Sequence, residues 1–177
     1  MLEIVMAMPV VLIALGMLVQ MMATGGGLRD AGREDGIAST AAQTAIEEMR
    51  NERFRDILPL YNSDPLDDPG GPGTAPGSTF DVRGLTALDP NLPDVIGEIL
   101  LPTWNAGSEV APSWQVREDV ANPLLGMPRD LTGDAVIDEL DHANDYTLMP
   151  VTVVLRWRGK LGPRELQLST VLAELYE

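Results

Sequence analysis

Five oxygen-bearing side chains in the last third of the chain recur at the spacing of ligands around one hard cation. Counted from the first, they occupy positions one, three, five, nine and twelve of one segment: Asp130, Thr132, Asp134, Asp138 and Asp141. The backbone carbonyl of Val136, at position seven, adds a sixth oxygen. Because Ca²⁺ takes about six to eight oxygen ligands from a segment that wraps around it, these residues predict a calcium site.

The same spacing is typical of EF-hand and dockerin-type calcium loops, with one departure. Position six is normally glycine because the backbone there takes a positive φ, whereas this chain has Ala135. Alanine in that conformation costs on the order of 1 kcal/mol or somewhat more, so we expect a weak Kd of about 10⁻⁴–10⁻³ M. Two alternatives stay open. One is an acidic turn that caps a short helix over residues 138–142, and the other is a transition-metal site formed by His142 with Asp138 or Asp141.

The other reactive side chains do not assemble into a catalytic set. His142 is the single histidine, and the chain has neither a nucleophile-elbow serine motif nor a phosphate-binding glycine loop. Glu118 and Asp119 are adjacent, so on a strand their carboxylates would point to opposite faces. We therefore expect no enzymatic activity. Packing in the core or on a sheet is expected for all three tryptophans, Trp104, Trp114 and Trp157.

The composition limits the partners of the protein. The 177 residues carry 27 acidic and 12 basic side chains, for a formal net charge of -15, and no cysteine. Nucleic acid and anionic membrane surfaces bind clustered lysine and arginine, so we expect neither as a partner. Without cysteine the chain forms no disulfide, no thiolate metal site and no catalytic thiol. The length that remains after an apolar N-terminal span fits one domain.

The apolar span near the N-terminus must be buried in a membrane or in an apolar protein core. Residues 4–19 carry no charge, and residues 21–23 extend the segment beyond Gln20 to about the 20 residues of a spanning helix. Glu3 precedes the span, and a carboxylate so close to lipid is expected to have a partner. A secretory signal cleaved near residues 23–25 and a plain single-pass anchor are two interpretations of the span.

The third interpretation is a resemblance to a known family. The run Leu2-Glu3-Ile4-Val5-Met6-Ala7, with an apolar helix that continues into an alanine- and glutamate-containing helix, resembles the start of a mature type IV pilin or pseudopilin. The resemblance implies a leader removed by a dedicated peptidase, a methylated amino terminus and a glutamate that meets the terminal amine of a neighbouring subunit. Glu3 matches that glutamate. Because the family's glutamate is usually the fifth mature residue, the expected cut lies just upstream of Met1.

Beyond the span, the pattern predicts a softened section and then an amphipathic helix. Glycines at positions 25–27, 32 and 36 each cost about 1 kcal/mol against alanine, so the helix is expected to be weak or melted there. Over residues 37–58 an apolar face recurs every four residues. Its members are Ile37, Ala41, Ala45 and Met49. Pro59 and residues 62–65 are expected to end this helix.

Strand signals fill the rest of the chain. Residues 79–83 alternate in polarity, residues 95–101 and 114–120 are weaker candidates, and the strongest pair is joined by a turn at residues 159–163. Each strand of that pair has one apolar face, consisting of Val151, Val153, Leu155 and Trp157 in the first and of Leu166, Leu168, Thr170 and Leu172 in the second. We predict an α+β fold in which a long N-terminal helix, hydrophobic and then amphipathic, packs on a small C-terminal antiparallel β-sheet. Residues 1–23 would form the transmembrane or filament-core segment, and residues 24–177 the rest of the helix with an extracytoplasmic sheet domain.

The strand pattern extends the resemblance over the second half of the chain. A glycine-led Phe-x-Val strand, a late valine-rich strand, a short glycine turn and a final Leu-Gln-Leu-Ser-Thr-Val-Leu strand resemble PilV-type minor pilins and related pseudopilins. The resemblance implies a structural subunit of a type IV pilus or a type II secretion filament. Such a subunit sits in the bacterial inner membrane and then in an extracytoplasmic or cell-surface filament, with other pilin subunits as its partners. The alternative is a membrane-anchored or secreted calcium-binding interaction module.

Overall fold

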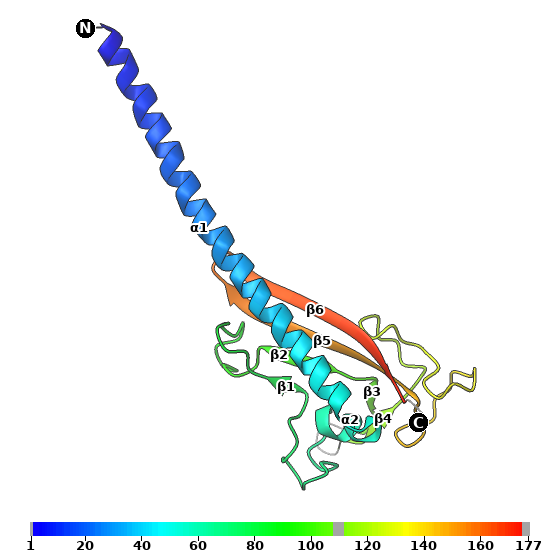
Figure 1. The fold of residues 1–177 in the computed structure, drawn as a ribbon. Helices are drawn as coiled ribbons and strands as arrows, with labels where there is room; N and C mark the ends of the chain where they lie inside the picture. Colours follow the sequence, from blue (N-terminus) through cyan, green and yellow to red (C-terminus); the bar gives the residue numbers. More distant parts are fainter. Residues whose placement is uncertain (1, 108–111, 175–177) are drawn as a thin grey trace.

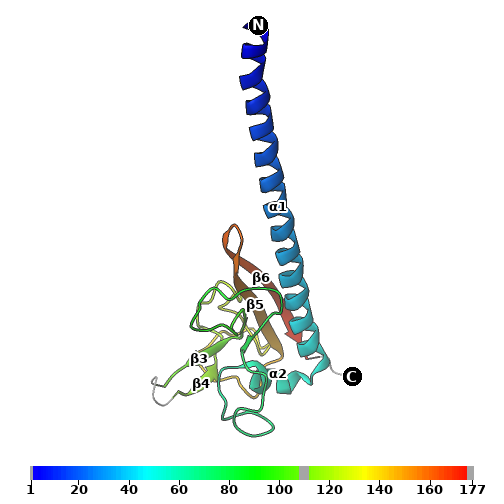
Figure 2. The ribbon, with the colours of Figure 1, turned by 90° about the vertical axis from the view of Figure 1, so that its left-hand side faces the viewer.

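One long helix dominates the fold. The computed structural model describes the backbone of residues 2–107 and 112–174, and the side chains of these residues except 2–10 and 22–24. Helix α1 (Leu2–Asn51) runs without interruption for 50 residues, which is about 75 Å at 1.5 Å per residue. Its N-terminal half projects away from the rest of the chain, while its C-terminal half lies along a sheet (Figure 1). The view at right angles shows the same division (Figure 2).

The strands form two antiparallel sheets. The main sheet has the order β1-β2-β5-β6, with β1 at Thr79–Phe80, β2 at Gly97–Leu100, β5 at Leu148–Gly159 and β6 at Gly162–Ala173. The second pairs β3 (Thr103–Asn105) with β4 (Trp114–Val116). The predicted combination of a long apolar N-terminal helix with a small antiparallel sheet is therefore confirmed. The strands predicted at 79–83, 95–101 and 114–120 are shorter than expected, and β3 was not predicted.

The core lies between α1 and the two longest strands. All four residues predicted for the apolar face of β5 are buried, and the register places Leu155 opposite Leu166 and Val153 opposite Leu168. The indole Nε1 of Trp157 donates to Glu34 Oε2 at 3.4 Å, so this face is turned toward α1. The helix contributes small side chains that permit a close approach, and its buried residues here are Ala38, Ala42, Ala45, Ile46 and Met49. The predicted helix face was right for Ala45 and Met49, whereas Ile37 and Ala41 lie at its half-buried margin.

The glycine-rich section of α1 is helical, so the prediction of a melted helix there was wrong, whereas the prediction of a weak helix stays a prediction. The turn between β5 and β6 docks against this section. Lys160 pairs with Asp30, and Arg164 Nη2 lies 2.8 Å from Asp35 Oδ2. These contacts tie the helix to the hairpin, and such tertiary contacts routinely override the low helix propensity of glycine.

The second helical half ends earlier than the pattern predicted. Helix α1 stops at Asn51, Arg53 is extended, and a separate helix α2 (Phe54–Tyr61) follows. Pro59 lies inside α2, so the prediction that it ends the helix was wrong, but the helical run does finish just before Asn62. The break redirects the chain so that α2 can bury Ile57, Leu58 and Tyr61.

Tyr146 gives the fold a predicted sensitivity to alkali. It is buried, its ring centroid lies 5.1 Å from that of Phe54, and its hydroxyl donates to the Phe54 carbonyl oxygen at 3.3 Å. Burial raises the pKa of Tyr146 to about 12, against about 10 for an exposed phenol. The folded state disfavours the phenolate form of Tyr146. Its contribution to the free energy of unfolding is therefore complete below pH 10 and is lost as the pH rises toward 12. We expect the full-length protein in detergent to lose on the order of 2 kcal/mol of unfolding free energy over this interval.

Chemical denaturation at several pH values, followed by far-UV circular dichroism, measures this loss. Tyr146→Phe keeps the ring packing and removes the ionisable hydroxyl, so its stability should fall less between pH 10 and 12. Equal losses in the two proteins would assign the alkaline transition to other groups.

Candidate metal centre

The N-terminal part of the predicted calcium loop is folded around Asp130. Its Oδ1 accepts a hydrogen bond from the Gly133 amide at 2.6 Å, and its Oδ2 accepts one from the Ala135 amide at 2.8 Å. Thr132 Oγ1 donates to the same carboxylate at 3.3 Å. The amide of Gly133, followed by that of Ala135, holds the pKa of Asp130 below its usual value against the effect of desolvation. Ala135 has a φ of 66°, which is the left-handed conformation expected at position six.

The remaining predicted ligands are engaged in other contacts. Asp134 Oδ1 accepts from the Val136 amide at 2.8 Å. Asp138 Oδ1 accepts from the Leu140 amide at 2.8 Å, and Asp141 Oδ1 accepts from the amide of Val116 in β4 at 3.0 Å. Residues 138–142 are not helical, so the alternative of a capped short helix was wrong. Calcium binding by Asp130, Thr132, Asp134, Val136, Asp138 and Asp141 stays a prediction.

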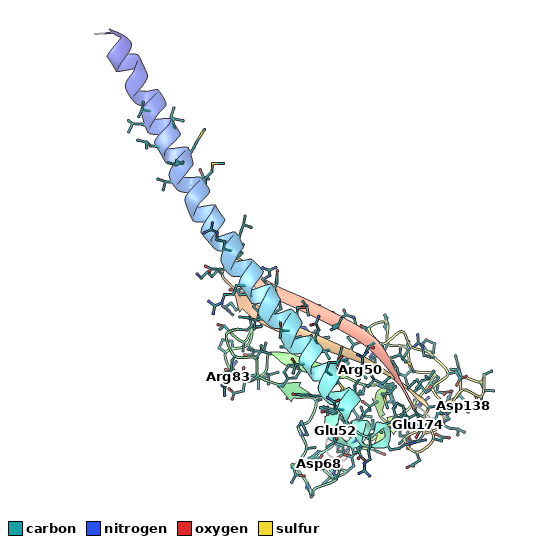
Figure 3. The ribbon with its side chains drawn as sticks, viewed as in Figure 1. Arg50, Glu52, Asp68, Arg83, Asp138 and Glu174 are labelled. Atoms are coloured by element: carbon teal, nitrogen blue, oxygen red, sulfur yellow. The ribbon has the colours of Figure 1, made fainter. Side chains whose placement is uncertain are left out.

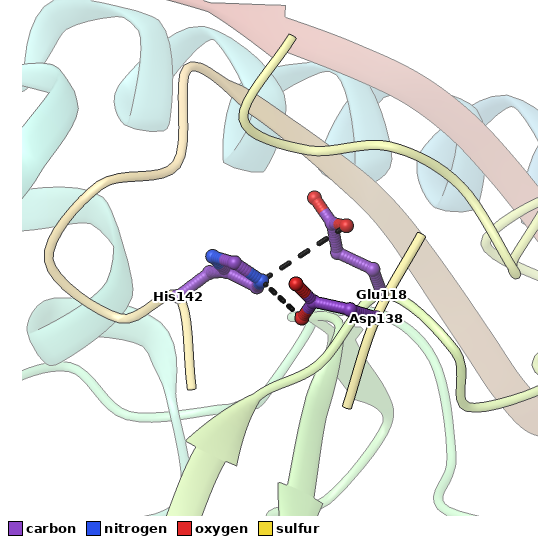
Figure 4. Close-up of side chains that lie close together, drawn as sticks. All are labelled: Glu118, Asp138 and His142. Carbon is purple, nitrogen blue, oxygen red and sulfur yellow. Dashed lines mark hydrogen bonds and ion pairs between the residues drawn. The ribbon is translucent and has the colours of Figure 1, made fainter. Parts of the chain in front are cut away.

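A different group brings three ligand atoms together. Glu118, Asp138 and His142 each offer one ligand atom, and the three atoms lie within 4.8 Å of one another (Figure 4). His142 Nε2 is 3.0 Å from Asp138 Oδ1 and 3.9 Å from Glu118 Oε2. Among the side chains that the structure describes, this is the one group of histidine and carboxylate ligands gathered so closely. Asp138 lies at the end of the domain that is remote from the free half of α1 (Figure 3).

Strand β4 positions this group. The His142 amide donates to the Val116 carbonyl oxygen at 2.8 Å, which fixes the backbone of the histidine against the end of the strand. Glu118 follows two residues later and is only 1% exposed. Its Oε1 accepts from the Leu131 amide at 2.5 Å and from the Thr132 amide at 3.1 Å. One buried carboxylate therefore holds the start of the acidic loop and faces the histidine with its other oxygen.

The His142 ring is surrounded by carboxylates. It is 6% exposed, with Nε2 facing Asp138 and Glu118 and with Nδ1 3.1 Å from Asp145 Oδ1. Burial by itself would lower the pKa of His142, but the hydrogen bonds to Asp138 and Asp145 and the charge of Glu118 outweigh it and raise the pKa above its usual value. The Leu140 amide and the histidine together lower the pKa of Asp138. The group therefore favours a positive charge at its centre.

The structure brings some of the sequence-predicted ligands together and leaves others apart. His142 and Asp138 meet, as one alternative required, whereas Asp141 is outside the group. Glu118 was considered only beside Asp119. In the structure the two carboxylates have different partners, because Asp119 accepts from Arg117 at 2.7 and 2.8 Å and Glu118 accepts from the Leu131 and Thr132 amides. No local spacing connects Glu118 with residues 138 and 142, so sequence reasoning missed it as a ligand. Glu3 lies in α1, and its side chain is outside the described ones.

Fold and site together define the class of protein. It is a mixed α+β protein whose one N-terminal helix is long and apolar enough to span a membrane, with an acidic histidine-containing group at the remote end of its sheet domain. No protein-family model, no curated protein and no solved structure matches the chain.

Proposed function

We propose that this protein is a structural subunit of a type IV pilin-like filament, either a pilus or a type II secretion pseudopilus. In this proposal the N-terminal half of α1 anchors the subunit in the bacterial inner membrane before assembly, and other subunits of the filament are its partners. The sheet domain then lies outside the cytoplasm. The observation that carries the proposal is the division of α1 into an exposed apolar half and a half packed on the sheet.

The free half of α1 presents an apolar surface that a single chain leaves uncovered. Every described side chain from residue 11 to residue 21 is exposed, and the large apolar ones are Val11, Leu12, Ile13, Leu15, Met17, Leu18, Val19 and Met21. The sticks in Figure 3 show these side chains pointing away from the helix on several sides. A helix that is apolar all round belongs in lipid or in a bundle of other helices.

The packed half of α1 makes the stem rigid with respect to the domain. Since the helix is continuous from the stem to Met49, and Met49 is buried in the core, the stem cannot swing without bending the helix. A rigid stem fixes the distance and angle at which sheet domains would be held around a filament axis. This arrangement supports repeated packing of stems, with the sheet domains outside.

Replacing Glu3 with alanine is expected to block assembly. An unpaired carboxylate in an apolar bundle is unfavourable until a cation reaches it, and in the pilin resemblance that cation is the terminal amine of a neighbouring subunit. Loss of Glu3 removes this pairing, so Glu3→Ala should accumulate in the membrane and be depleted at least tenfold from the sheared-filament fraction. Quantitative immunoblotting of the two fractions measures the effect.

Glu52→Ala is the matched control because Glu52 is an exposed glutamate just beyond the other end of α1 (Figure 3). It should assemble like the unaltered protein. Wild-type amounts of Glu3→Ala in the sheared fraction, or no wild-type protein in that fraction, would contradict the filament proposal.

One observation favours the second candidate function, a membrane-anchored or secreted calcium-binding module. Ala135 takes the left-handed backbone that position six of a calcium loop requires, and Asp130 is held at position one by the Gly133 and Ala135 amides. This candidate predicts that Glu3→Ala leaves the location of the protein unchanged, and that Asp130→Ala abolishes calcium binding in a titration of the full-length protein.

A further inference from the structure

We propose that Glu118, Asp138 and His142 form a binding site for a divalent transition-metal ion, with Zn²⁺ as the best-fitting probe. The ligand atoms are Glu118 Oε2, Asp138 Oδ1 and His142 Nε2, and water would complete the coordination. This site is distinct from the predicted calcium loop, although Asp138 belongs to both sets. The inference does not depend on the proposed function.

The spacing of the three atoms fits a small ion. Bonds of about 2.0–2.1 Å in a tetrahedral zinc site place neighbouring ligand atoms about 3.3 Å apart. The two separations from His142 Nε2 are 3.0 Å to Asp138 and 3.9 Å to Glu118, which bracket that value. All three pairs of ligand atoms lie within 4.8 Å. One imidazole nitrogen with two carboxylate oxygens is a ligand set that suits Zn²⁺ better than Ca²⁺, which prefers oxygen alone.

Each of two ligands is already oriented by a second contact. Asp145 Oδ1 lies 3.1 Å from His142 Nδ1, so a hydrogen bond there directs Nε2 toward Glu118 and Asp138. A carboxylate that holds the remote nitrogen of a metal-binding histidine is the usual outer partner in zinc sites. The amides of Leu131 and Thr132 hold Glu118 Oε1. Within the described part of the chain, no hydrogen bond reaches Oε2, and it faces the histidine.

The acidic side chains around the His142 ring also favour the binding of a cation. Three carboxylates, those of Glu118, Asp138 and Asp145, face a single imidazole. Acidic side chains therefore outnumber the single basic ring in this group, and Glu118 is buried. A divalent cation at Nε2 would lie next to all of the carboxylates that face this side of the ring. Asp138 has 34% of its side chain exposed, which leaves the ion a path from solvent.

Bound metal would join two parts of the chain that are distant in sequence. Glu118 follows β4, whereas Asp138 and His142 belong to the loop that leads into β5. The ion would therefore fasten this loop to the end of the small sheet. Removing it is expected to loosen residues 130–145 and to leave the packing of α1 on β5 unchanged.

The test uses the full-length chain in detergent, without a polyhistidine tag, freed of metal with EDTA. ZnCl₂ is titrated calorimetrically in the presence of millimolar MgCl₂, which masks nonspecific binding to the many acidic side chains. We expect one Zn²⁺ per chain. His142→Ala should abolish this binding, and Asp145→Asn, which alters only the outer partner, should weaken it about 10–100-fold.

Asp130→Asn is the matched control, because Asp130 belongs to the predicted calcium loop alone and should leave the Zn²⁺ affinity unchanged. A second measurement, on the unaltered protein, does not depend on whether the variants fold. His142 is the only histidine, so ¹⁵N-histidine labelling reports a single ring, and Zn²⁺ should shift the Nε2 resonance far more than Nδ1. The proposal is overturned if Zn²⁺ leaves the His142 ring resonances unshifted, or if a folded His142→Ala variant binds Zn²⁺ with wild-type affinity. It is also overturned if millimolar Ca²⁺ displaces the bound Zn²⁺.

Discussion

Replacing Trp157 with alanine is expected to lower the free energy of unfolding by about 3–5 kcal/mol. Trp157 is 1% exposed and lies in β5 on the face that meets α1. Its indole donates to Glu34 at 3.4 Å, and the guanidinium of Arg164 lies 5.9 Å from the ring centroid. Truncation removes a large, almost fully buried side chain between the helix and the sheet, and a closely packed core relaxes only partially into the cavity that is left. It also removes one of the contacts that hold the glycine-rich section of α1.

Trp104→Ala is the matched control because it makes the same chemical change at a tryptophan that is 45% exposed. Its effect should stay within about 1 kcal/mol, since little packing is lost. Chemical denaturation of the full-length protein in detergent, followed by far-UV circular dichroism, avoids using tryptophan as the reporter. Comparable losses in the two variants would show that the interface between α1 and β5 does not dominate the stability of the domain.

The two tryptophans also show what the sequence can and cannot predict. Alternation along residues 151–157 placed Trp157 correctly in the core, because each side of a strand carries every second residue. Core or sheet packing was expected for Trp104 as well. It lies in β3, opposite Gln115 of β4 in the two-stranded sheet and outside the core, with 45% of the residue exposed. The exposure of a side chain depends on what lies above its sheet, which is a long-range property.

The central part of α1 shows the opposite case, in which local propensity was misleading. Five glycines argued for a weak helix, whereas Asp30 and Asp35 hold this section to Lys160 and Arg164 of the hairpin. The basic partners are far from the helix in sequence: Lys160 and Asp30 are 130 residues apart. Local sequence records the intrinsic cost of glycine and contains no information about such compensating contacts.

The candidate metal centre was predictable in part. Asp138 and His142 are four residues apart, and the sequence alone identified them as a pair that could meet. Glu118 joins them through long-range contacts: the His142 amide donates to the Val116 carbonyl oxygen at 2.8 Å, and the Leu131 and Thr132 amides donate to Glu118 Oε1. Ala135 illustrates the reverse: the spacing of the acidic residues predicted a left-handed residue at this position, and the φ of 66° agrees.

Introducing arginine at Leu12 is expected to release the protein from membranes. Leu12 is 68% exposed near the middle of the apolar stem, in the helix that is long and apolar enough to span a bilayer. An arginine near the centre of a spanning helix costs about 2.5–3.5 kcal/mol on insertion scales. We therefore expect Leu12→Arg to be recovered mainly in the soluble fraction after alkaline carbonate extraction, whereas the unaltered protein stays in the pellet. Immunoblotting of the two fractions measures the change.

Leu66→Arg is the matched control, because Leu66 is even more exposed, at 76%, but lies in a loop of the sheet domain. The same substitution there should leave membrane retention unchanged, since no apolar surface is shared with the stem. If both variants remain in the pellet, the stem is held by something other than lipid, and packing among stems becomes the stronger explanation. If both are released, the sheet domain itself contacts the membrane, and the division of α1 into an anchoring half and a packed half would no longer account for where the protein resides.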